Sequence, residues 1–307
     1  MKKFLLAALL LGASAAPLLA QQQILPLYSG VIPDAKPSNL QEVSEKRPDG
    51  GEFVRQVVSP KLLVYPAPAD KANGTAVVVC PGGGYGFLSM VNEGYQIAER
   101  LNGMGITVFV VKYRLPNDAS QPDKSIVPLL DAQQAIRMVR EQAAKFNVNP
   151  NRIGLMGFSA GGHLASTAGT HFAQPVGPKP GPTSVRPDFL MLIYPVITFN
   201  DSLTHAGSRN NLIGSAPAAD QVRLYSNELQ VSAQTPPTFL VHAEDDNVVP
   251  VQNSLLFYQA CVNHKVPAEM HLYPKGGHGF GLYNRTTKDD WSERLREWLD
   301  MNGWLTK

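Results

Sequence analysis

Residues 157–161 carry a serine in the pattern G-x-S-x-G, directly after an apolar run and before a helical stretch that begins near Gly162. A serine on a sharp strand-to-helix turn has strained backbone geometry, and the glycines on either side leave room for that turn. The helix start beneath it favours negative charge. We therefore predict that Ser159 is the nucleophile of an acyl-transfer reaction, with a tight structural turn as the alternative.

A serine hydroxyl needs a base to take its proton. Four of the histidines that follow Ser159 in the sequence are considered for this role. His278 lies in a glycine-rich loop after the last predicted strand, where partners can orient its ring, so we predict it as the base. His271 falls inside the alternating pattern of that strand and is interpreted as a strand side chain. His163 and His171 follow the serine too closely to reach back over it, and a structural role in a helix is favoured for His163.

The acid that orients the base is expected in the loop after the strand 238–242, where three carboxylates are adjacent. Asp246 is favoured, Asp245 comes next, and Glu244 is the third candidate. The chosen side chain would accept the Nδ1 proton of His278 and stabilise the imidazolium.

The glycine run Pro81–Gly86 follows an apolar strand and could supply N–H donors for an oxyanion, because glycines let the main chain approach a ligand. Gly83, Gly84 and the N–H of Ala160 are the predicted donors. A phosphate loop and an ordinary glycine turn are the alternatives. Neither a Walker lysine nor a complete G-x-G-x-x-G is present, which disfavours a nucleotide site.

The walls of the substrate pocket are predicted to include Tyr85, Phe87, Tyr194 and the insertion 199–237. For Tyr85, core packing is an equal alternative. Long insertions in compact domains tend to be functional loops, so the insertion is expected to resemble a lid.

These residues need a scaffold, and short apolar runs alternate with helical patterns along the chain. This alternation predicts an α/β fold with a mostly parallel central sheet flanked by helices. Buried strands are expected over 75–80, 106–113, 152–156, 189–193, 238–242 and 269–273, and helices over 93–104, 127–146 and 291–304.

The N-terminus is predicted to be processed. Two lysines precede a short apolar run that ends in small residues near Ala20, which is typical of a signal peptide over 1–20. A membrane anchor is the alternative, but the run is short for that role. Residues 21–51 are rich in Pro, Ser and charge, and are expected to form an extended lead-in without function. The catalytic domain is predicted over 52–307, in a periplasmic or secreted protein without a stable membrane anchor.

The composition limits the classes of partner that the protein is expected to bind. Hydrophobic residues make up 44% and charged residues 17% of the 307 residues, with a formal charge of +2. This balance lacks the basic excess that nucleic acids require. Cys80 and Cys261 are interpreted as buried apolar residues rather than a disulfide, and no Cys/His cluster supports zinc. We expect neither a metal nor another cofactor; the oligomeric state is left open.

The motifs together resemble a known group, the α/β-hydrolase esterases related to acetyl esterase/lipase proteins and to bacterial feruloyl and acetylxylan esterases. The shared segments are PGGGY at 81–85, KYRLP at 112–116, DAQQAIRMVR from Asp131, GFSAGGHLA at 157–165, HAEDDNVVP and GGHGF. In this pattern the place of the acid falls on Asp246. Hormone-sensitive-lipase relatives carry HGGG, whereas this chain has Pro81 before its glycines, which moves the resemblance toward the exported polysaccharide esterases.

The resemblance implies a serine esterase that removes acetyl or feruloyl groups from xylan, other hemicellulose or their oligosaccharides through an acyl-enzyme intermediate. An exopeptidase of the prolyl oligopeptidase kind is a second reading, although little sequence precedes the core for the propeller of such enzymes. A catalytically silent glycan-binding protein is the third. Acetyl versus feruloyl preference stays open.

Overall fold

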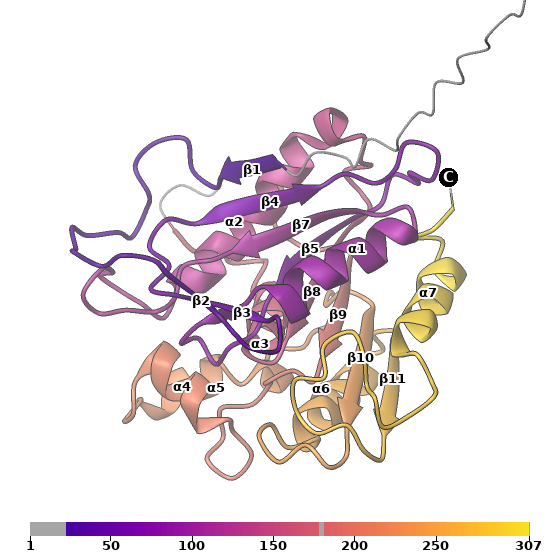
Figure 1. The fold of residues 1–307 in the computed structure, drawn as a ribbon. Coiled ribbons are helices and arrows are strands. Elements are labelled where there is room, and N and C mark those ends of the chain that lie inside the picture. Colours follow the sequence, from indigo (N-terminus) through magenta and orange to yellow (C-terminus); the bar gives the residue numbers. More distant parts are fainter. Residues whose placement is uncertain (1–22, 178–180, 307) are drawn as a thin grey trace, which may run out of the picture.

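The computed structural model describes residues 23–177 and 181–306, so the predicted signal peptide lies outside it. An eight-stranded sheet forms the centre, in the order β1-β4-β7-β5-β8-β9-β10-β11 (Figure 1). Strands from β7 to β11 pair in parallel, while β1 and β4 are antiparallel additions at one edge. The strands are β1 (Gln23–Pro26), β4 (Lys61–Tyr65), β5 (Ala76–Cys80), β7 (Thr107–Lys112), β8 (Ile153–Phe158), β9 (Phe189–Ile193), β10 (Thr238–Ala243) and β11 (Ala268–Tyr273).

Helices cover both faces of this sheet, as the alternating pattern predicts. Figure 1 shows α1 and α7 over one face and α2, α3 and α6 over the other. Their bounds are α1 (Gln96–Gly103), α2 (Val127–Glu141), α3 (Ala160–Thr170), α6 (Gln252–Asn263) and α7 (Trp291–Met301).

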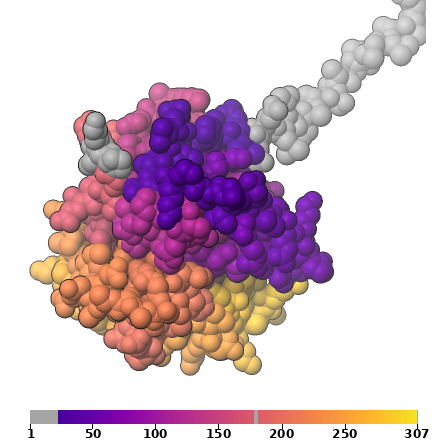
Figure 2. All heavy atoms as spheres, turned by 90° about the vertical axis from the view of Figure 1, so that its left-hand side faces the viewer, coloured from indigo at the N-terminus to yellow at the C-terminus, as the bar shows by residue number. Residues whose placement is uncertain are grey.

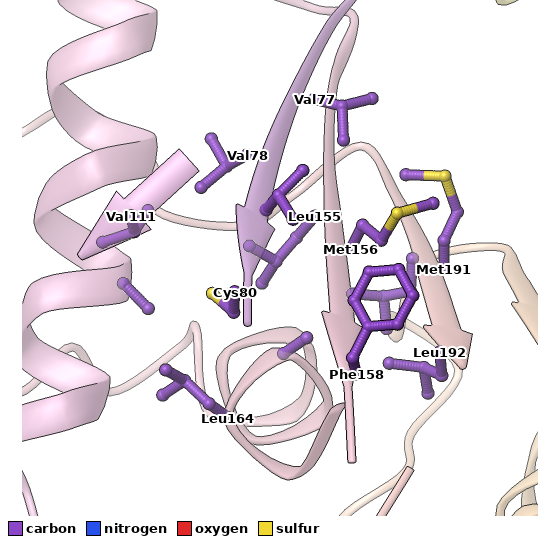
Figure 3. Packing of buried hydrophobic residues seen from close by; sticks show 14 of the residues in the cluster. Val77, Val78, Cys80, Val111, Leu155, Met156, Phe158, Leu164, Met191 and Leu192 are labelled. Carbon is purple, nitrogen blue, oxygen red and sulfur yellow. The ribbon is translucent and has the colours of Figure 1, made fainter. Parts of the chain in front are cut away.

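The core lies where the parallel strands are buried on both faces, which explains their continuous apolar runs. Figure 3 shows side chains of β5, β8 and β9 packed together, with Leu164 of α3 lying close by. Cys80 and Cys261 are buried free thiols, as expected for apolar packing residues. In the part of the chain that the structure describes, no helix has the length and apolar character needed to cross a bilayer.

Residues 23–51 contain strands within the expected extended lead-in. β1 pairs with β4 in the central sheet, and β2 (Val43–Lys46) forms a hairpin with β3 (Glu52–Arg55). This N-terminal hairpin, residues 43–55, joins β6 (Leu88–Ser89) in a separate three-stranded sheet. Short exposed strands such as β2 are stabilised by their pairing partners, which local periodicity does not reveal. In Figure 2 the indigo N-terminal part of the chain lies across the outer surface of the molecule.

One helix departs from expectation. The helix predicted over 93–104 begins as a π-helical turn, Val91–Tyr95, before α1. Such turns are rare and are frequently found at functional sites.

The insertion 199–237, which was expected to resemble a lid, contains α4 (Ala206–Ile213), α5 (Ala219–Leu224) and a short 3₁₀ turn, Asn227–Leu229.

Candidate active site

Ser159 sits on the turn between β8 and α3 with φ 51° and ψ −120°, a conformation that L-residues rarely adopt. Neighbouring glycines make this turn sterically possible. A Cβ on Gly157 would lie 2.1 Å from the carbonyl oxygen of Gly161, and a Cβ on Gly161 would lie 2.1 Å from that of Cys80. The backbone thus directs the serine away from the sheet while α3 begins directly after it.

Three side chains from separate loops form one continuous hydrogen-bonded relay. The Oγ of Ser159 lies 2.8 Å from Nε2 of His278, and Nδ1 of His278 lies 2.7 Å from Oδ2 of Asp246. The serine follows β8, the aspartate follows β10 and the histidine follows β11, so all three lie at the carboxyl ends of parallel strands. This arrangement can move a proton from the serine hydroxyl to the imidazole while the carboxylate holds the ring.

The carboxylate of Asp246 is buried and fully partnered. Its Oδ1 accepts hydrogen bonds from the backbone N–H groups of Val248 and Val249, at 2.9 and 2.8 Å. Its Oδ2 also lies 3.3 Å from Nε2 of His242, a buried histidine at the end of β10. Burial alone would raise the pKa of Asp246, but the hydrogen bonds from His242 and His278 outweigh it and hold the pKa well below its usual range.

The competing carboxylates of the same loop do not reach the histidine ring. Glu244 and Asp245 are exposed, whereas Asp246 is only 6% exposed. Asp245 instead accepts a hydrogen bond from the N–H of Gly277, at 2.7 Å, and so fixes the loop that carries His278.

The other histidines lie elsewhere. His271 pairs with Glu269 on β11, at 2.8 Å. His163 is a buried residue of α3, where its ring stacks on Phe199 and burial lowers its pKa to about 4. Both therefore have the structural placement that their sequence context indicates.

The predicted oxyanion donors lie around the serine. Gly83 and Gly84 have φ 130° and 62°, and both line the cleft that contains Ser159. Among the residues that the structure describes, their N–H groups have no acceptor, and neither does that of Ala160, the first residue of α3. The N–H of Gly82 is already used, since it donates to Oε2 of Glu93 at 2.8 Å.

Glu93 is a buried acid that the sequence reading missed. It lies on the π-helical turn, lines the cleft, and its Oε1 accepts the hydroxyl of Tyr194 at 2.9 Å. The same hydroxyl accepts the N–H of Gly281, at 3.0 Å, in the histidine loop. Burial raises the pKa of Glu93, while the hydrogen bonds from Tyr194 and Gly82 act against that rise. One side chain thus joins the glycine run to the histidine loop.

Of the three predicted wall residues, only Phe87 lines the cleft. Tyr85 is 2% exposed, and its hydroxyl lies 2.9 Å from Nδ1 of His163 in the core, so its packing alternative applies. Tyr194 is fully buried with its ring centroid 5.2 Å from that of His278. Both tyrosines are therefore buried packing residues next to the site and do not line the cleft.

Two further segments line the cleft, and one of them, the insertion 199–237, was expected to do so. The N-terminal hairpin contributes Arg47, Asp49 and Phe53, which corrects the expectation that residues 21–51 have no part in the site. The insertion contributes His205, and Nδ2 of Asn211 in α4 donates to the carbonyl oxygen of Gly84 at 2.8 Å. The insertion is therefore attached to the glycine run.

Within residues 23–177 and 181–306, no group of three or more His, Cys, Asp or Glu side chains is placed to hold a metal ion. The polar groups that converge on Ser159 are those of an acyl-transfer site.

Comparison with curated proteins gives relatives that carry xylan-related names. The chain is 41% identical over 217 residues to an acetylxylan esterase of Xylanibacter ruminicola, covering 69% of this chain and 42% of that protein. It is 35% identical over 235 residues to endo-1,4-beta-xylanase B of Butyrivibrio fibrisolvens, covering 76% of this chain and 36% of that protein. The chain thus spans well under half the length of either relative.

Among solved structures, the acetyl ester-xyloside bifunctional hydrolase from Caldicellulosiruptor lactoaceticus superposes with a TM-score of 0.77 at 38% identity. That match covers 94% of this chain and 99% of the other, which confirms the α/β-hydrolase fold predicted from the sequence. The model of the BD-FAE family matches residues 62–261, a region that includes Ser159 and Asp246. On this family match and these similarities, the chain belongs to the BD-FAE family of the α/β-hydrolases.

Proposed function

We propose that the protein is an exported serine esterase that removes acetyl or feruloyl groups from xylan or its oligosaccharides. The observation that carries the proposal is the relay of Ser159, His278 and Asp246, with separations of 2.8 and 2.7 Å. The hydrogen-bond distances fall within the range expected of a nucleophile paired with its base.

The proposed reaction has two halves. In the first, Nε2 of His278 takes the proton of Ser159 as Oγ attacks the ester carbonyl, and the N–H groups of Gly83, Gly84 and Ala160 stabilise the oxyanion. His278 then gives the proton to the leaving alcohol oxygen, which leaves an acyl group on the serine. In the second half, water attacks this acyl-enzyme with His278 again as base, releasing the carboxylic acid and free serine.

The xylan assignment draws on the names of the relatives, of which two mention acetyl esters: an acetylxylan esterase and an acetyl ester-xyloside hydrolase. Removal of acetyl groups is therefore the favoured form of the reaction. The sequence pattern of residues 1–20 supports export. Export also suits an enzyme that acts on xylan, because this polymer lies outside the cytoplasm.

The direct test is Ser159→Ala. We expect kcat on 4-nitrophenyl acetate to fall by about 10⁴-fold or more, with an unchanged melting temperature, because the nucleophile is lost and the fold is not. The wild type, but not the variant, should be labelled by a fluorophosphonate probe. Retained activity in the variant would rule out the proposed nucleophile.

The substrate is tested separately, by measuring acetate and ferulate released from acetylated and feruloylated xylan. Release of acetate supports the acetyl esterase form, and release of ferulate the feruloyl form. Hydrolysis of dipeptide anilides in preference to both esters would favour an exopeptidase instead.

A further inference from the structure

We propose that the N-terminal hairpin and His205 form a binding subsite for the sugar part of the ester, a neutral polyhydroxylated alcohol. The inference deepens the proposed function and rests on it. Its starting point is the size of the cleft, which is about 430 Å³. An acetyl group fills only a small part of such a space, so most of the cleft is left for the alcohol side of the substrate.

The hairpin is fixed to the catalytic machinery by a stack of four side chains. The guanidinium of Arg47 lies 4.7 Å from the ring centre of Phe53, the two rings of Phe53 and Phe87 are 4.1 Å apart, and Arg55 lies 5.0 Å from Phe87. The N–H of Phe87 in turn donates to the carbonyl oxygen of Gly83. The hairpin therefore keeps a defined position relative to the oxyanion donors.

The polar groups at the Arg47 end of this stack can form hydrogen bonds with hydroxyl groups. Nε and Nη2 of Arg47 donate to Oδ2 of Asp49, at 3.2 and 3.1 Å, and the N–H of Gly51 donates to Oδ1 at 2.9 Å. Nη1 of Arg47 has no acceptor among the described residues. Because the pair has no net charge, it offers both a donor and acceptor oxygens without selecting for an anion. Vicinal hydroxyls of a sugar match this combination.

His205 supplies a second donor from the insertion. Its Nδ1 accepts the N–H of Ser208 at 3.3 Å, which assigns the proton of the neutral ring to Nε2. Burial lowers the pKa of His205, so the neutral ring is favoured. Nε2 has no partner among the described residues, and the side chain lines the cleft.

Figure 1 shows β2 and β3 set apart from the central sheet, with α4 close below them. The hairpin and the start of α4 therefore supply the two donors from different segments of the chain, on walls that enclose Ser159. A sugar ester held between them would present its acyl carbon to the serine, whereas an ester without a sugar would not use these groups.

Arg47→Ala tests the subsite, and Arg296→Ala on α7 is its matched control. The two arginine side chains are 40% and 44% exposed, and each pairs with a carboxylate, Asp49 and Glu293 respectively. Of the two, Arg47 alone lines the cleft. We expect Arg47→Ala to raise KM for acetylated xylobiose about tenfold, as for loss of one or two hydrogen bonds, and to change kcat/KM for 4-nitrophenyl acetate less than about twofold. Arg296→Ala should leave the kinetics on both substrates unchanged.

A second variant, His205→Phe, keeps an aromatic ring but removes the donor, and should give the same selective rise in KM. Equal losses on both substrates, no change on either, or the same effect in Arg296→Ala would overturn the subsite.

Binding of the sugar can be separated from catalysis by using xylobiose as a competitor of 4-nitrophenyl acetate hydrolysis. Competition that weakens about tenfold in Arg47→Ala supports the subsite. A wild-type enzyme that is inhibited by xylobiose in this way but releases no acetate from the sugar ester would contradict the proposed function and leave the subsite supported. Absence of competition in the wild type would contradict the subsite.

Discussion

The catalytic loops and the N-terminal hairpin line the same cleft but are built in different ways. Ser159, Asp246 and His278 each follow a strand of the parallel sheet, so the fold brings them together at one edge. The hairpin belongs to a separate three-stranded antiparallel sheet and reaches the cleft through contacts between Phe53 and Phe87. The proposed catalytic residues thus lie on the central sheet, while the outer wall of the cleft comes from a separate small sheet.

The difference implies a separation of effects. Changes in the relay should impair every substrate equally, because they act on the bond being broken. Changes in the hairpin should act on the alcohol that is bound, and so depend on whether the substrate carries a sugar. The following experiments test that separation.

The largest effect is expected for Asp246→Asn, which leaves the geometry intact but favours the wrong tautomer of His278. We expect kcat to fall by about 10⁴-fold, and equally for 4-nitrophenyl acetate and for a sugar ester. Steady-state kinetics on both substrates measure it.

Asp245→Asn is the matched control, since this neighbouring carboxylate is exposed and accepts a hydrogen bond from the N–H of Gly277 rather than from the ring of His278. It should reduce kcat less than about tenfold. A larger loss in Asp245→Asn than in Asp246→Asn would reverse the assignment of the acid. A loss confined to the sugar ester would break the separation between chemistry and recognition.

An intermediate effect is expected at Glu93, which joins the glycine run to the histidine loop. In Glu93→Ala, the N–H of Gly82 and the hydroxyl of Tyr194 lose their shared acceptor. We expect kcat to fall by about 10²-fold on both substrates with little change in KM, because a small displacement of reacting groups is costly.

Glu93→Gln retains one acceptor oxygen and should therefore recover most of the kcat that Glu93→Ala loses. If the negative charge were required, this recovery would not occur. Gln with the same loss as Ala would show that the negative charge, rather than the positioning, is needed. Unchanged kcat in Glu93→Ala would remove the residue from the site altogether.

The candidate site shows what the sequence could and could not predict. The juxtaposition of Ser159 and His278 was predictable because a glycine-bounded elbow and a glycine-rich loop after the last strand are local patterns. The choice of Asp246 among adjacent carboxylates depends on which side chain turns inward, and sequence left Asp245 open. Glu93 gives no local signal, since its role comes from a π-helical turn and from Tyr194, a hundred and one residues away.

Prediction of the fold likewise succeeded where the sequence signal is local and failed where it is not. Runs such as 75–80 and 189–193 predicted β5 and β9 closely, because strands buried on both faces are apolar throughout. β1 was missed because it is a short, mostly exposed strand whose partner, β4, lies far along the chain, and β2 was missed because all of its residues are exposed. Arg47 and Asp49 were missed with them.

The smallest effect concerns stability in acid. The folded-state pKa of Asp246 is held below its usual range, so its contribution to stability is fully present above the unfolded value of about 3.9 and is lost as pH falls through the folded value. Asp246→Asn lacks this dependence. The difference in melting temperature, wild type minus variant, should therefore decrease as pH is lowered from about 6 to about 3.

Thermal unfolding of both proteins across this range, followed by circular dichroism, measures the difference. A difference that stays constant with pH would mean that the carboxylate contributes no charge-dependent stability. The hairpin variant Arg47→Ala serves as a comparison that should follow the wild-type profile.

The position of β11 at the edge of the sheet has a consequence for the order of events in time. The loop with His278 follows this last strand, 119 residues after the serine. A chain that emerges from its N-terminus during synthesis therefore exposes the elbow before the loop of His278 has been made. Under the proposed mechanism, a nascent or truncated chain without β11 lacks the proton acceptor of the serine and should be inactive toward esters.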